Sequence, residues 1–243
     1  MRGQLFASVV ALFFAGSAHA LPITACGQTV PTGETAELMN DLICMDRYGV
    51  TLEDGATLNL NGFSITGPGS GGVGVLCDSG GCAVSGPGDI SHFDSGIFGT
   101  PDVQVLNVKD VRLRNNEYGI HAAYNGVKVT NVVADDNEGW GILVDRLRGT
   151  GIQANNNGEG GVGANKFTLV GLTASGNGRE GGLIYGAGSL IRSTVTGNDG
   201  LGQGYDVISQ KRVRLRNTVC GKSARLDKLD PTKVVGSFGC AND

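Results

Sequence analysis

Short runs of alternating apolar and polar residues follow one another along most of the chain, as in β-strands with one buried side. Such a run precedes each member of a series of Asn residues, and a Gly followed by an aliphatic residue comes a few positions after the first four of them. The phrase returns about every 20 residues, a period that marks repeat architectures. Its Asn residues are Asn116, Asn137, Asn157, Asn177, Asn198 and Asn217.

This repeat predicts a solenoid, in which each coil buries its apolar side only by stacking on its neighbours. Each repeat contains three strand-like runs and no helical periodicity. We therefore expect an all-β fold, a single-stranded right-handed parallel β-helix of seven or eight coils over residues 47–219. The residues predicted to point into its core are Val111, Leu113, Val132, Ala134, Ile152, Ala154, Leu172, Ala174, Val195, Val213 and Leu215.

The Asn series has a structural explanation. Amides stacked at the strand spacing of about 4.8 Å can hydrogen bond from coil to coil. Asn also tolerates the left-handed backbone conformation that tight corners require. We interpret five members of the series as a buried ladder rather than a ligand site: Asn116, Asn137, Asn157, Asn177 and Asn198.

The two end segments lack the repeat. Residues 21–46 and 220–243 are expected to cover the ends of the solenoid, because an uncapped solenoid exposes unpaired strand edges. If the protein contains any helix, the apolar spacing places it at 35–43, as a cap on the first coil.

Residues 1–20 have the features of a secretory signal, with an early Arg2, an apolar run and a small-residue cleavage site ending at Ala20. The segment is too short to be a membrane anchor. We expect a secreted or periplasmic protein that does not insert into the membrane.

Six cysteines follow the cleavage site, an even number that suggests disulfides in an exported protein. Their proximity favours three local pairs, although 15 connectivities are possible. A zinc site is the alternative, and the lack of Cys-x-x-Cys pairs argues against it. The favoured pairs are Cys26 with Cys44, Cys77 with Cys82, and Cys220 with Cys240.

The net charge of −4 argues against nucleic acid as a partner. Glycine accounts for 42 of 243 residues without an every-third-residue period, which excludes collagen.

Three segments carry a resemblance to a known family: the Asn to Gly-Ile repeats, the segment Leu58-Asn-Leu-Asn-Gly-Phe-Ser-Ile-Thr-Gly67, and the opening from Cys26-Gly27 to Cys44. With these the chain resembles the right-handed parallel β-helix superfamily of exported bacterial proteins, the pectate-lyase-like group. The resemblance covers nearly all of the chain after residue 20 and implies the fold. It does not imply one reaction, because members include lyases, glycoside hydrolases, epimerases and proteins without known activity.

Two of the family's chemistries lack their residues here. A glycosidase resembling polygalacturonase needs clustered Asp residues and a Gly-His-Gly segment, but the chain offers only Asp135-Asp136. A calcium-dependent lyase needs Asp residues stacked on successive coils, and no such stack is evident in the sequence. We expect no metal and no other cofactor.

One constellation remains. Counting outward from each Gly-aliphatic pair brings polar residues of three successive coils to one face, within about 5–10 Å of one another. They could bind an acidic sugar or transfer a proton. The alternative is that the corners of a solenoid are polar in any case. The candidates are His121, Tyr124, Asp145, Arg146 and Lys166 for catalysis and Asn165 for ligand binding.

Two further features have two interpretations each. Trp140 and Tyr118, at neighbouring turns, could stack on a sugar ring or pack the coil corner. The basic residues that alternate through Lys211–Arg216 could attract polyanions or protect the edge of a terminal strand.

Three functions are compatible with these residues. The first is binding of, or scaffolding on, an acidic polysaccharide without catalysis, favoured because the repeats are too short for the long loops that wall a cleft. The second is a lyase or epimerase acting on uronate polymers. The third is a structural element whose faces contact other proteins.

Overall fold

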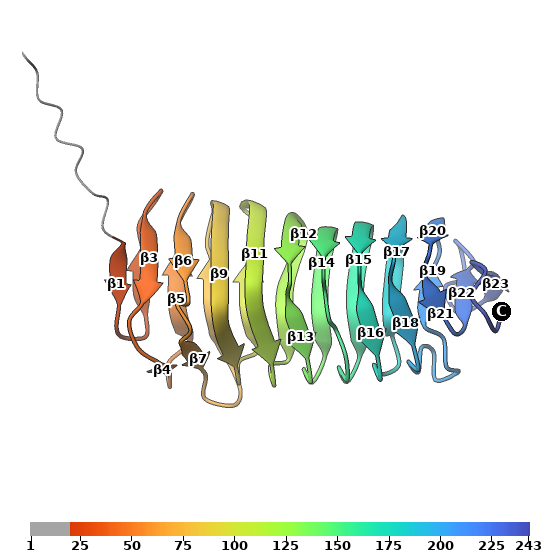
Figure 1. Ribbon diagram of the computed structural model, residues 1–243, viewed down its shortest axis with the longest axis horizontal. Coiled ribbons are helices and arrows are strands. Elements are labelled where there is room, and N and C mark those ends of the chain that lie inside the picture. The colour runs from red at the N-terminus through yellow and green to blue at the C-terminus, as the bar shows by residue number, and fades with distance from the viewer. Residues whose placement is uncertain (1–19) are drawn as a thin grey trace, which may run out of the picture.

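The computed structural model describes residues 20–243, apart from the side chains of residues 123–125 and 184–185. Its coils stack along one long axis, with the first strands at one end and the C-terminal segment at the other (Figure 1). Within these residues the regular secondary structure consists of β-strands alone, and the strands of successive coils pair in parallel. The predicted all-β parallel solenoid is confirmed, with about nine turns. The proposed leader lies almost entirely outside the described residues.

Three ladders of parallel strands form the walls of the solenoid. The first ladder runs through β2 (Gln28–Val30), β5 (Tyr48–Leu52), β8 (Val73–Cys77), β10 (Ser95–Gly99), the first halves of β12 (Tyr118–Thr130), β14 (Trp140–Thr150), β15 (Gly160–Val170) and β17 (Gly181–Ile191), then β19 (Val207–Ser209) and β22 (Ser223–Leu226).

The second ladder runs through β1 (Leu21–Ile23), β3 (Thr35–Leu38), β6 (Thr57–Asn59), the first parts of β9 (Gly80–Ser91) and β11 (Val103–Arg114), the second halves of β12, β14, β15 and β17, and β20 (Val213–Arg216). The third ladder runs through β4 (Leu42–Ile43), β7 (Ser64–Thr66), the ends of β9 and β11, β13 (Val133–Asp135), Gln153, β16 (Thr173–Ser175), β18 (Thr194–Thr196) and β21 (Val219–Cys220).

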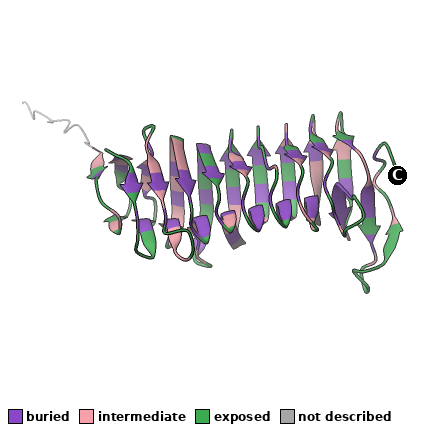
Figure 2. Cartoon of the chain, turned by 90° about the horizontal axis from the view of Figure 1, so that it is seen from below, coloured by how far each residue is buried: buried purple, intermediate pink, exposed green. Residues whose placement is uncertain are grey.

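The core lies along the axis, inside the three ladders. Buried and exposed residues alternate along the strands that surround it (Figure 2). All of the residues predicted to point inward are buried except Leu215, which is half-buried against the core. Fully burying a Val, Leu or Ile side chain contributes about 1.5–3 kcal/mol. Because each coil adds several, stacking is the main stabilising force.

The predicted ladder of asparagines is present from Asn116 to Asn198, with every member at most 4% exposed. From Asn116 to Asn177, each Asn donates its backbone N–H and its Nδ2 to the Oδ1 of the Asn on the next coil. For Asn137 and Asn157 both distances are 3.0 Å. The first acceptor of the series, Asn116 Oδ1, receives the N–H of Phe93 at 3.1 Å.

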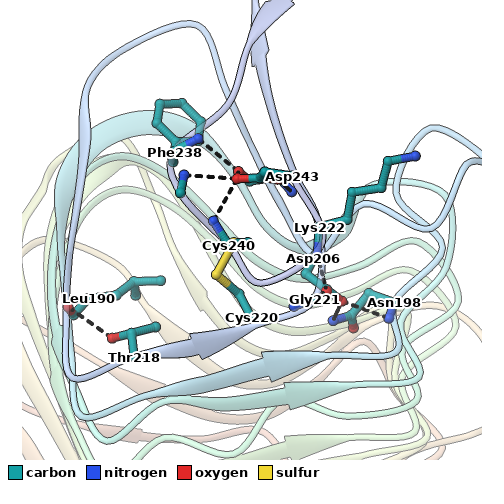
Figure 3. The surroundings of a disulfide bond; sticks show 12 residues. Leu190, Asn198, Asp206, Thr218, Cys220, Gly221, Lys222, Phe238, Cys240 and Asp243 are labelled. Atoms are coloured by element: carbon teal, nitrogen blue, oxygen red, sulfur yellow. Dashed lines mark hydrogen bonds between the residues drawn. A yellow bond between two sulfur atoms is a disulfide. The ribbon is translucent and has the colours of Figure 1, made fainter.

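The last acceptor of this ladder is a buried carboxylate. Asn198 donates its backbone N–H and Nδ2 to Asp206 Oδ1 at 3.0 and 2.9 Å. The other oxygen, Oδ2, accepts the N–H groups of Gly221 and Lys222 at 2.8 and 3.0 Å (Figure 3). Asp206 therefore joins the ladder to the C-terminal segment.

Asn217 continues the spacing of the Asn series in the sequence but is not part of the ladder. It is exposed, with a φ of 48°, and directly follows β20. It belongs to the corner between the second and third ladders, where Asn131 at 52° and Arg192 at 48° take the same left-handed conformation. The buried ladder and this exposed corner column both repeat about every 20 residues, so the period alone could not show to which of them Asn217 belongs.

The segment 35–43, the one place where the sequence allowed a helix, forms strands instead. Residues 35–38 form β3 and residues 42–43 form β4, so this segment supplies rungs of the second and third ladders. The buried positions at Ala36, Leu38 and Leu42 fit strands as well as they fit a helix turn. Pairing with the next coil decided between them.

All three predicted disulfides are present: Cys26–Cys44, Cys77–Cys82 and Cys220–Cys240. Three disulfides indicate an oxidising environment. Within residues 20–243 no helix has the length and apolar character that crossing a bilayer requires.

The last bridge ties down the C-terminal segment, whose β23 (Val234–Gly236) pairs antiparallel with β22. Phe238 packs against the core, whereas Val234 and Val235 stay about 40% exposed. Asp243 accepts hydrogen bonds from Ser223 and Gly239 and from Cys240 (Figure 3). Burial alone would raise the pKa of the Asp243 carboxyl, but these bonds outweigh burial and lower it.

Candidate functional site

The outward side of the second ladder carries a group of cations that we call the basic face. The strands there alternate inward apolar residues such as Val127, Leu147 and Phe167 with outward charged ones. The repeat then places the outward residues of successive coils in register, about 4.8 Å apart. The basic face consists of Lys128, Arg146, Arg148, Lys166, Arg212 and Arg214, all exposed.

Two columns of residues make up this face. In one, Arg146 pairs in register with Lys166, and Lys166 with Ala187. Arg212 follows at the next rung, where its carbonyl accepts the N–H of Gly188. The residues of the other column, each in register with the next, are Lys128, Arg148, Thr168, Ser189 and Arg214.

An open hollow of about 510 Å³, which we call the trough, lies within the basic face. Its floor is formed by the small residues Ala187, Gly188 and Ser189 of β17, the rung of this face that carries no long outward side chain. Every ionisable side chain that lines it is a cation. These are Arg146, Arg148, Lys166, Arg212 and Arg214.

Only one of the six cations forms an ion pair among the described side chains: Arg146 Nε lies 3.1 Å from Asp145 Oδ2. Asp145 also accepts Asn165 Nδ2 at 3.0 Å. Burial raises the pKa of Asp145, but the bonds from Asn165 and Arg146 and the nearby charge of Lys166 outweigh it and lower the pKa. The carboxylate therefore stays ionised near neutral pH and offsets part of the charge of Arg146.

The structure thus brings together four of the predicted site residues, Asp145, Arg146, Asn165 and Lys166, at the corner between the first and second ladders. Tyr124 belongs to the same corner, in a segment of β12 that is two residues longer than its partner in β14. Its side chain lies outside the described part of the chain.

His121 lies on the outward side of the first ladder instead, in register with Leu143. Its ring stacks on Tyr118 with centroids 4.7 Å apart and meets Phe98 edge-on at 5.4 Å. Burial lowers the pKa of His121, so the imidazole is neutral near pH 7. Burial and the carboxylates of Glu117 and Glu159 raise the pKa of Tyr118.

Trp140 is 4% exposed. Its indole covers Gly160 and Gly163 on the next coil so closely that a Cβ at Gly160 would meet the ring at 2.5 Å. This arrangement leaves little of the ring for a ligand, whereas the half-buried Tyr118 keeps part of its surface open.

Acidic residues gather on another edge of the solenoid, at the corner that leads into the first ladder. Glu117, Glu159 and Glu180 stand in one column there, linked through backbone hydrogen bonds of successive coils and Gly139. This acidic column lies on a different edge from the basic face. Within residues 20–243 no group of three or more potential ligands could hold a metal ion.

Sequence reasoning missed Lys128 and Arg148 as site residues. The signal was present, because Val127-Lys128-Val129 and Arg146-Leu147-Arg148 show the same apolar and basic alternation that drew attention to Lys211–Arg216. What joins these segments is strand register, which only the fold provides. The edge of β20 opposite β17 has no strand partner within the described residues, so Arg214 and Arg216 also protect an open edge.

Comparison with protein-family models, curated proteins and solved structures gave no match to this chain. The parallel β-solenoid therefore rests on the strand pairing alone.

Proposed function

We propose that this protein is an exported member of the pectate-lyase-like superfamily that binds acidic polysaccharide on the basic face. The observation that carries the proposal is the row of cations along the solenoid axis, of which only Arg146 has an anionic partner among the described side chains. Like charges placed on neighbouring strands repel one another and destabilise a sheet. An anionic ligand removes that repulsion, and Arg side chains can hold carboxylates through paired hydrogen bonds.

The shape of the face supports a polymer rather than a small molecule. Lys128 and Arg214 lie four rungs apart, about 19 Å at the strand spacing. Two more shallow hollows, of about 500 and 470 Å³, extend the trough over the same face and share Lys128 and Arg148 with each other. A chain that follows the axis would meet a cation on most rungs.

The test compares two charge-matched double variants for binding to polygalacturonate. Arg148→Gln with Lys166→Gln removes two cations from the basic face, and we expect binding at least tenfold weaker, a change of about 1.4 kcal/mol. The control, Arg179→Gln with Lys228→Gln, removes two exposed cations elsewhere and should bind as the parent protein does. Equal binding by all three proteins, or no binding by any, would contradict the proposal.

A lyase or epimerase reaction on uronate polymers is the second candidate. The observation that favours it is the pairing of a neutral imidazole at His121 with a protonated phenol at Tyr118, which could act as base and acid. Incubation with polygalacturonate should then increase the absorbance of an unsaturated product if the reaction is a lyase reaction, and His121→Ala should abolish the increase. Polymer binding without any change in absorbance or sugar configuration contradicts this candidate and leaves the first intact.

A further inference from the structure

The cations of the basic face are grouped in pairs across the rungs. Arg146 and Arg148 stand side by side on β14, and Arg212 and Arg214 stand side by side at β20. The two pairs are three rungs apart, about 14 Å. Lys166 lies between them, and no carboxylate lines the trough that they enclose.

This pairing bears on the charge that a sugar ring must carry. A ring placed across a rung with two cations meets both of them. A polyuronate has one carboxylate on each ring and can neutralise only one cation of such a pair. A polysaccharide with two sulfate esters on a ring can neutralise both, and each group neutralised releases further counterions.

The floor of the trough fits the same ligand. Ala187 and Gly188 have no long side chains, so an anionic group can approach the sheet closely. Thr168 and Ser189 place two hydroxyl groups beside the cations, in register on adjacent strands. Hydroxyl donors and guanidinium groups together suit an anion with three terminal oxygens, because each oxygen can accept its own hydrogen bond.

We propose that the preferred ligand of the basic face is a polysulfated polysaccharide, with sulfate esters seated in the trough between Lys166 and Arg214. This inference rests on the proposed function, which it narrows from acidic polysaccharides in general to those with two or more charges on a ring.

The first experiment varies charge density on one backbone. Dextran sulfates of equal length, substituted at one or at two sulfates per ring, are compared with carboxymethyl-dextrans of the same two degrees of substitution. We expect affinity to rise at least tenfold from one to two sulfates per ring, with a steeper dependence on salt concentration. The carboxymethyl series should gain less, because a carboxylate has one oxygen fewer.

The second experiment tests whether the trough produces this gain in affinity from one to two sulfates per ring. Arg212→Gln with Arg214→Gln should lose most of the gain in affinity, whereas the charge-matched Arg179→Gln with Lys228→Gln should keep it. Ala187→Leu fills the floor without changing charge and should also reduce the gain. Asn107→Leu, an exposed position on the same column as Ser189 but four rungs away, should not.

Two outcomes separate this inference from the proposed function. Binding of polygalacturonate by the basic face, without a gain from the second sulfate, overturns the preference for sulfate and leaves the function standing. A sulfate gain that is equal in all four variants shows attraction to net charge alone and overturns the trough as its site.

Discussion

The asparagine ladder and the basic face result from the same repeat. In the ladder, Asn recurs at one inward position of successive coils. On the basic face, cations recur on the outward side of the second ladder, although Thr168 and Ser189 interrupt the column of Arg148. The stacked amides are neutral and satisfy one another as donors and acceptors. The stacked cations repel one another, and only Arg146 has an anionic partner among the described residues. Stacking thus stabilises the fold in the first case, whereas in the second case we propose that the stacked cations serve to bind a ligand.

The largest effect should come from the carboxylate that ends the ladder. Asp206→Ala leaves the N–H groups of Asn198, Gly221 and Lys222 and one side-chain amide without their acceptor. At about 1–3 kcal/mol for each buried unsatisfied group, partly relieved by relaxation, we expect the free energy of unfolding to fall by about 3 kcal/mol or more. Urea denaturation measures the loss.

Asp206→Asn serves as the control for that variant, because it keeps one acceptor oxygen. An intermediate loss of stability is expected. If Asp206→Ala is as stable as the parent protein, the hydrogen bonds at this end do not hold the last coils together.

Removal of the Cys220–Cys240 bridge should have the next largest effect. The bridge closes a loop of 20 residues, which is worth about 3 kcal/mol in the chain-entropy model. Without it Phe238 loses its fixed position against the core, so Cys220→Ser with Cys240→Ser should aggregate at a temperature where circular dichroism still shows β-structure. Light scattering that rises only after the β signal is lost would contradict this order of events.

Within the ladder, Asn137→Leu should lower the free energy of unfolding by about 1–3 kcal/mol, because Asn116 loses its acceptor and Asn157 its donor. The matched change on the outside is Thr173→Ser at an exposed position of β16, which should alter stability by less than about 0.5 kcal/mol. Identical melting temperatures for the two variants would mean that the ladder does not stabilise the fold.

The smallest effect on stability is expected on the basic face. Arg148→Gln with Lys166→Gln should change the free energy of unfolding by less than about 0.5 kcal/mol, or raise it slightly, because two like charges on neighbouring coils are removed. Weaker polysaccharide binding by this variant would then result from the loss of the two cations and not from misfolding. A marked destabilisation would instead assign these cations to the fold.

Much of this structure could be predicted from local patterns. The period of the Asn series and the alternation around Leu113 and Ala134 indicated stacked strands and their inward sides. Cysteine proximity indicated three bridges, which are present. The sequence left a helix open at 35–43, where the chain forms strands, because a short apolar spacing fits both a helix turn and two strands. Pairing with the neighbouring coil decided the outcome.

The candidate site was predictable only in part, for a related reason. Asp145, Arg146, Asn165 and Lys166 were found because they follow the same Gly-aliphatic phrase on neighbouring coils. His121 directly follows Gly119-Ile120 as Leu143 follows Gly141-Ile142, so it lies in the column of Leu143 on the first ladder and not at the corner. The two additional residues of β12 come after it, between Ala122 and Gly126.

The sequence by itself determined the period, the inward residues and the identity of the ladder Asn, because these depend on interactions between equivalent positions of adjacent coils. Tertiary structure alone decided where the ladder ends and which cations share a face. Asp206 follows Asn198 by eight residues, outside the period, and reaches it only because residues 199–205 fold back. Arg146, Lys166 and Arg212 come within a few rungs of one another because strand register aligns them, and register depends on the length of every corner between them.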